Sequence, residues 1–91
     1  MKNTIHITAE VPTTYQYNSI RSFGMEVTKH FNGGYTARKE FDSREDAKAY
    51  LISRAENYAQ DEHQLAEMLE QIQERGCLTI DACMAYIDEI D

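Results

Sequence analysis

The chain has 91 residues, 42% of them hydrophobic, and a formal net charge of −7. This length predicts one domain, residues 1–91, whose core is too small to enclose a large active site. No apolar run approaches the ~20 residues that a membrane-spanning helix needs, no signal-peptide core follows the N-terminus, and two cysteines are too few for a disulfide framework, so we expect a cytoplasmic protein that does not enter a membrane.

The charge is distributed unevenly along the chain. Residues 1–42 carry five cations and four anions, whereas residues 43–91 carry four cations and twelve anions. An acidic domain repels the phosphate backbone, so we expect no direct binding of nucleic acid. A protein partner with a basic surface suits this charge better.

Residues 4–11 alternate between apolar and polar side chains, which predicts a half-buried strand. Ile7 and Ala9 belong to the apolar face. His6 belongs to the opposite face, so we expect it to be exposed and without special chemistry. Pro12 ends the strand or marks it as an edge strand.

The segment Thr13–Ser19 allows two interpretations. As a loop it would present Tyr15 and Tyr17 to solvent, in the tyrosine-, serine- and asparagine-rich composition of adaptable binding loops. As a strand it would place both tyrosines on one face, where aromatic side chains usually pack.

A hairpin is predicted between residues 20–31 and 35–41, joined by Asn32-Gly33-Gly34. The apolar residues on both sides of this turn have odd numbers. A three-residue loop keeps them on one face by pairing Phe31 with Tyr35, whereas a two-residue turn would not. We therefore predict the three-residue loop.

A capped amphipathic helix is predicted after the hairpin. Ser43 is a natural N-cap, and Asp46 lies in the first turn, where the helix dipole favours negative charge. The apolar side chains recur at intervals of three and four residues, as a helix requires: Ala47, Tyr50, Leu51, Ala55 and Tyr58.

The helical pattern then either continues to Arg75 or breaks near residues 59–61. One continuous helix from Ser43 would be about 50 Å long, at ~1.5 Å per residue, and would imply a coiled-coil dimer. A break is favoured because Asp61 can cap a new helix with Gln64 three residues later. Gly76 is expected to end that helix in the left-handed conformation.

A third helix is predicted after Thr79, which serves as its N-cap. Leu78 before the cap and Cys83 in the first turns would form a hydrophobic staple. The expected fold class is therefore α+β, with a three-stranded antiparallel sheet and two or three helices packed on one face.

The residue patterns predict no enzyme, no metal site and no cofactor. His63 and Glu67 share a helical face, but zinc needs three or four ligands and no full set is visible. Cys77 and Cys83 form no Cys-x-x-Cys motif. The glycines of the hairpin turn are not followed directly by a helix, so phosphate binding is not supported.

Acidic side chains on the predicted helices are the one feature of the sequence that indicates a function. A rigid row of carboxylates can imitate a phosphate backbone and occupy the basic groove of a nucleic-acid-binding protein. The alternative is a solvated helix face that keeps a small protein soluble. If the row binds, the partner-binding residues are Glu56, Glu67, Glu70, Glu74, Asp88 and Glu89, with Tyr15 and Tyr17 as aromatic anchors.

One resemblance extends over about half of the chain. The run Ala37-Arg38-Lys39-Glu40-Phe41-Asp42-Ser43 after Asn32-Gly33, followed by an acidic helix start and later by Met68-Leu69-Glu70-Gln71-Ile72, resembles small phage-encoded anti-CRISPR inhibitors of type I systems. The resemblance implies a compact domain that binds a CRISPR effector complex and blocks target DNA, and it transfers no functional residue. We expect a small acidic non-catalytic protein-binding module, an inhibitor from a phage or mobile element. The alternative is a structural or homo-oligomeric domain that dimerises through its helices.

Overall fold

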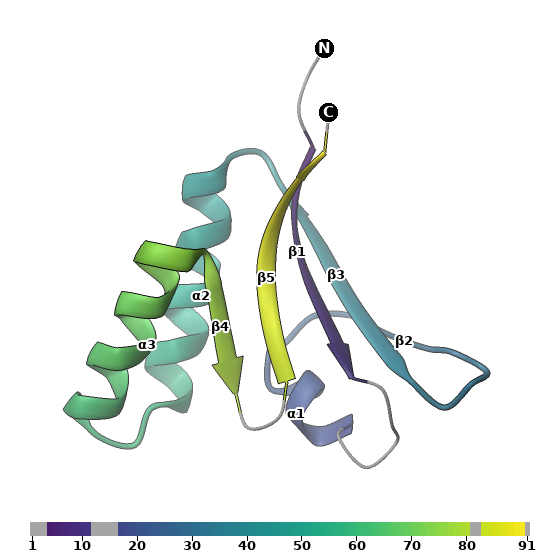
Figure 1. Cartoon of the computed structure of the whole chain (residues 1–91), viewed down its shortest axis with the longest axis horizontal. Helices are drawn as coiled ribbons and strands as arrows, with labels where there is room; N and C mark the ends of the chain where they lie inside the picture. The colour runs from purple at the N-terminus through teal and green to yellow at the C-terminus, as the bar shows by residue number, and fades with distance from the viewer. Residues whose placement is uncertain (1–3, 12–16, 81–82, 91) are drawn as a thin grey trace.

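The computed structural model describes residues 4–11, 17–80 and 83–90, which form a five-stranded antiparallel sheet and three helices (Figure 1). The strand order across the sheet is β2-β3-β1-β5-β4. The elements are β1 (Thr4–Val11), α1 (Tyr17–Arg21), β2 (Val27–Lys29), β3 (Tyr35–Phe41), α2 (Arg44–Tyr58), α3 (Glu62–Arg75), β4 (Cys77–Ile80) and β5 (Cys83–Ile90).

The central strand is β1, which pairs antiparallel with β3 on one side and β5 on the other. Its alternation is confirmed, because Ile7, Ala9 and Val11 are buried on one face. Helix α2 contacts four strands of the sheet and covers this face, with its own Ala47 and Leu51 fully buried. The prediction that helices pack on the apolar face is therefore correct.

The predicted number of strands is wrong, because the segment expected to be the third helix forms β4 and β5. Leu78 and Ile80 of β4 pair with Ala85 and Cys83 of β5, and all four side chains are buried on the helix-covered face. A strand period of two explains these residues as well as a helical period does. Pairing of β5 along the whole length of β1 decides the outcome, and a contact between the two ends of the chain leaves no local signal.

The hairpin register differs from the prediction by two residues. Lys29 pairs with Tyr35, and the backbone N–H of His30 donates to the carbonyl of Gly34 at 2.8 Å, so the loop has three residues as predicted but begins one residue earlier, at Phe31. Odd-numbered residues still pair with odd-numbered residues, as predicted. Phe31, however, does not pair with Tyr35 and is fully exposed in the hairpin loop. Within the turn, the side chain of Asn32 accepts from the N–H of Gly34 at 3.1 Å, which stabilises the shifted loop.

The predicted strand over residues 20–31 forms only at Val27–Lys29, and the preceding residues form the short helix α1 and a turn. Phe23 and Met25 are buried, as the pattern requires, but outside any strand. The turn contains Gly24 at φ 71°, a conformation that costs glycine little. Of the ambiguous segment, residues 13–16 lie outside the described ranges, and Tyr17 begins α1, so it belongs to neither a loop nor a strand.

Two of the three predicted helix starts are confirmed, whereas Thr79 lies within β4. The Ser43 hydroxyl accepts from the Asp46 N–H at 3.1 Å, and the Asp61 carboxylate accepts from the Gln64 N–H at 2.8 Å. Helix α2 ends at Tyr58, so the favoured break between two helices is confirmed and the single long helix is wrong. The two helices, α2 and α3, pack on each other. Gly76 ends α3 at φ 65°, as predicted.

Candidate functional site

Two surfaces of the described structure concentrate polar side chains: the sheet face that α2 does not cover, and the outer face of α3. On the uncovered face, the alternation of β1 places His6 and Thr8 between side chains of β3 and β5. The α3 surface consists of carboxylates on successive turns of one helix. The two surfaces offer different chemistry.

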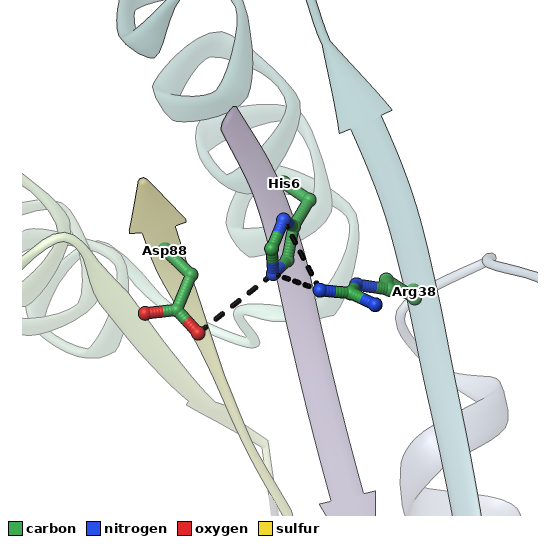
Figure 2. Close-up of polar contacts among 3 residues, drawn as sticks. All are labelled: His6, Arg38 and Asp88. Carbon is green, nitrogen blue, oxygen red and sulfur yellow. Dashed lines mark hydrogen bonds and ion pairs between the residues drawn. The ribbon is translucent and has the colours of Figure 1, made fainter. Parts of the chain in front are cut away.

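His6 lies on the uncovered sheet face, on β1 between β3 and β5, and is only 1% exposed (Figure 2). The Arg38 guanidinium of β3 lies 2.7 Å from His6 Nε2 and 3.4 Å from Nδ1. The Asp88 carboxylate of β5 lies 3.7 Å from His6 Nε2 on the other side. These three residues therefore link the three central strands.

The Arg38 guanidinium approaches both nitrogens of the His6 ring. Arginine has only donors, so a ring nitrogen that bonds to Arg38 does so as the acceptor, and which of the two accepts depends on the tautomer. Asp88 is beyond hydrogen-bond distance and contributes a longer electrostatic contact. His6 is thus enclosed by two charged neighbours and has almost no surface with which to reach a substrate.

The prediction that His6 is exposed is wrong. The alternation of β1 places it correctly on the face opposite the core, but Arg38 and Asp88 cover it from the neighbouring strands. No local pattern could have revealed this, because Asp88 was assigned to a helix and its position beside His6 depends on long-range pairing.

The uncovered face is acidic around Tyr86. The pKa of the Tyr86 hydroxyl is raised by desolvation on burial and by the carboxylates of Glu10 and Asp88, whereas the Arg38 guanidinium lowers it. A tyrosine held protonated in this way can donate a hydrogen bond but does not act as a base at neutral pH.

The two cysteines are buried and free. The Cys83 thiol donates to the Glu10 carbonyl at 3.8 Å, and burial raises the pKa of Cys83 to about 11. The thiol is therefore protonated at neutral pH, which does not suit a nucleophile or a metal ligand. Within the described ranges, no group of three or more histidine, cysteine or acidic side chains could hold a metal ion.

The outer face of α3 brings three of the predicted partner-binding residues together. Glu67, Glu70 and Glu74 are all exposed, and with Gln71 and Arg75 they line a shallow hollow of about 180 Å³. Glu67 also forms an exposed ion pair with His63 one turn earlier, at 3.2 Å. Carboxylates at this spacing lie ~5–6 Å apart and present a continuous negative strip.

The remaining predicted residues do not join this strip. Glu56 is exposed on α2, and Asp88 faces His6 on the sheet. Glu89 belongs to β5 and Tyr17 to α1, but their side chains are not described, and Tyr15 lies outside the described ranges. The predicted set therefore divides, and only the α3 carboxylates form a single surface among the residues that can be placed.

None of the helices in the described part of the chain combines the length and the apolar character required to cross a membrane. Comparison of the chain with protein-family models, with curated proteins and with solved structures gives no match.

Proposed function

We propose that this chain is a small acidic, non-catalytic protein-binding module that acts in the cytoplasm and docks through α3 onto a basic surface of a protein partner. The observation that carries the proposal is the exposure of Glu67, Glu70 and Glu74 along one side of α3. The neighbouring helix provides the comparison: the sequence of α2 contains three cations and three anions, whereas that of α3 contains four glutamates and one arginine.

The specific form of binding that we propose is inhibition. A strip of carboxylates competes with the phosphate backbone for the same lysine and arginine side chains. A partner whose basic surface normally holds nucleic acid would lose access to it when α3 is bound. This activity suits a protein encoded by a phage or mobile element, the source that the resemblance to anti-CRISPR inhibitors implies.

The rival proposal is a structural domain that dimerises through its helices. Its original basis was one long helix, and that helix is divided at Ala59 into two helices that pack on each other within the chain. Light scattering of the purified protein separates the two proposals. A monomer at micromolar concentration removes the rival, and a stable dimer that buries α3 removes ours.

The experiment that tests the proposal is affinity capture with charge-reversed variants. The triple variant Glu67→Lys, Glu70→Lys, Glu74→Lys should lose a partner that the wild type retains from a lysate of the organism that encodes it. The matched control reverses the exposed carboxylates of Glu26, Glu40 and Asp42, which changes the net charge equally but lies outside α3. A partner retained equally by both triple variants contradicts the α3 proposal.

A further inference from the structure

Helix α3 lies beside β4, the strand at one edge of the sheet (Figure 1). Side chains of α3 and Thr79 of β4 line a groove. Its volume is about 230 Å³, and its lining consists of Gln64, Glu67, Met68, Gln71 and Thr79. Met68 is the largely buried, apolar member of this lining, whereas Glu67 also belongs to the acidic strip of α3. The groove therefore joins the strip to the edge of the sheet.

The backbone of β4 presents hydrogen-bonding groups to this groove. The Gly76 carbonyl accepts from the Ile87 N–H at 2.8 Å, and in an antiparallel pair the residues that bond to the partner strand alternate. Leu78 and Ile80 thus bond toward β5, while Cys77 and Thr79 direct their N–H and C=O groups away from the sheet. An edge of this kind is a template for a further strand.

One of these outward groups is already engaged by a side chain in place of a strand. The Thr79 N–H donates to Gln71 Oε1 at 2.9 Å, so an amide carbonyl occupies the position that the carbonyl of an added strand would take. Gln71 is only partly buried and has rotatable bonds, so it can leave this position without disturbing the core.

Charge selects the kind of strand that the edge would accept. Glu67 borders the groove, with Glu70 and Glu74 beside it on the same helix. Pairing of β4 with β4 of a second copy would bring two acidic helices together, which is unfavourable. Alternate side chains of an added strand would face α3, and lysine or arginine there would meet these carboxylates.

We propose that β4 accepts an extended basic segment of a partner protein as an additional strand, with Gln71 displaced from the Thr79 N–H. This inference rests on the proposed function for the basic character of the partner, but it adds a specific backbone contact that a purely electrostatic surface does not need.

The test uses a fluorescent peptide of alternating lysine and valine, and the same peptide N-methylated at alternate residues. N-methylation removes the backbone donors on one edge but retains every charge. The two possible N-methylated peptides block opposite edges, so we expect one of them to bind the wild-type protein about as well as the unmodified peptide and the other to bind roughly tenfold or more weakly. Equal binding of all three peptides, or no binding of any, overturns the inference.

Two protein variants examine the same contact from the other side. Thr79→Pro removes an outward N–H without removing a bond to β5, so it should abolish the preference for the unmodified peptide. Gln71→Ala removes the competing carbonyl and should tighten binding several-fold; unchanged or weaker binding contradicts displacement of Gln71. Circular dichroism establishes that each variant is folded, and the N-methylated peptides test the inference even where a variant is not.

The outcomes also separate the inference from the proposed function. If the N-methylated peptides bind as well as the unmodified one and the Glu67/Glu70/Glu74 reversal abolishes both, the acidic strip is a docking surface but β4 adds no strand. If the unmodified peptide binds selectively and the charge reversal has no effect, the edge accepts strands regardless of charge. That result contradicts both the basic specificity and the proposed role of the strip.

Discussion

The Arg38 guanidinium lies 2.7 Å from His6 Nε2, and this contact covers a histidine, only 1% exposed, on the sheet face that no helix covers in the described structure. Loss of the arginine would leave a buried ring nitrogen without its donor. Arg38→Met should therefore lower the free energy of unfolding by about 1–3 kcal/mol. Lys29→Met, which removes an exposed cation from β2, should change it by less than about 0.5 kcal/mol.

A double-mutant cycle on this pair gives a sharper result. His6→Leu removes the acceptor as well as its need for a donor, so the double variant His6→Leu, Arg38→Met should be more stable than the sum of the two single effects predicts. We expect a coupling of about 1 kcal/mol in urea denaturation. Additive effects would show that the 2.7 Å contact does not contribute to stability.

A second interaction fixes the segment between α1 and β2 on α2. The Tyr50 hydroxyl donates to the Phe23 carbonyl at 2.6 Å, and the Arg54 guanidinium donates to the Ser22 carbonyl at 2.7 Å. Tyr50→Phe should lower the free energy of unfolding by about 1 kcal/mol. The control Tyr86→Phe removes a hydroxyl from the uncovered sheet face and should have the smaller effect.

The turn at Gly24 makes the same segment sensitive to side-chain size. A Cβ added there would lie 3.0 Å from an Arg54 nitrogen, and φ is 71°, a conformation unfavourable for alanine. Gly24→Ala should destabilise the protein by about 1–2 kcal/mol. At Gly33 a Cβ would meet nothing within 4 Å, but φ is 93°, so Gly33→Ala measures backbone strain alone and should cost less.

Alkaline pH should destabilise the fold through Cys83. Burial raises the pKa of this thiol from 9.0 to about 11, so the folded state retains a proton that the unfolded chain releases earlier. The stability that this provides is fully present below pH 9.0 and is lost as the pH rises toward about 11. The pKa values of Tyr50 and Tyr86 are also raised by burial, so their loss of stability begins above pH 10.0 and adds to the same trend.

The variant Cys83→Ala isolates the contribution of the thiol. At neutral pH it should be less stable than the wild type by about 1 kcal/mol, because a small cavity replaces the sulfur. Between neutral and strongly alkaline pH it should lose about 2 kcal/mol less than the wild type does. Parallel pH profiles of unfolding free energy for the two proteins would contradict this account.

The sequence predicted the elements whose signals are local. The caps at Ser43 and Asp61, the left-handed Gly76 and the alternation of β1 each involve residues within a few positions of one another. Helical spacing likewise predicted that Glu67, Glu70 and Glu74 share one exposed side of α3, so this part of the candidate site could be predicted from the sequence.

The elements that the sequence missed depend on distant partners. Residues 77–90 carry apolar side chains that suit either a helix or a strand, and β1, more than 70 positions earlier, decides between the two by pairing with β5. The burial of His6 follows from that pairing, because Asp88 reaches it only when β5 lies beside β1. The predicted hairpin register was wrong for a different reason. The alternation of side chains determines which face a residue occupies, but a register shift of two residues leaves every side chain on the same face.

The most direct test of the central claim is the affinity of a captured, purified partner for three proteins at low and high salt: the wild type, the Glu67/Glu70/Glu74 reversal and the Glu26/Glu40/Asp42 reversal. We expect the α3 reversal to weaken binding by at least roughly a hundredfold, the control reversal by far less, and the wild-type affinity to fall steeply with salt. Equal losses in the two reversals, or an affinity indifferent to salt, would show that the partner is not held by α3.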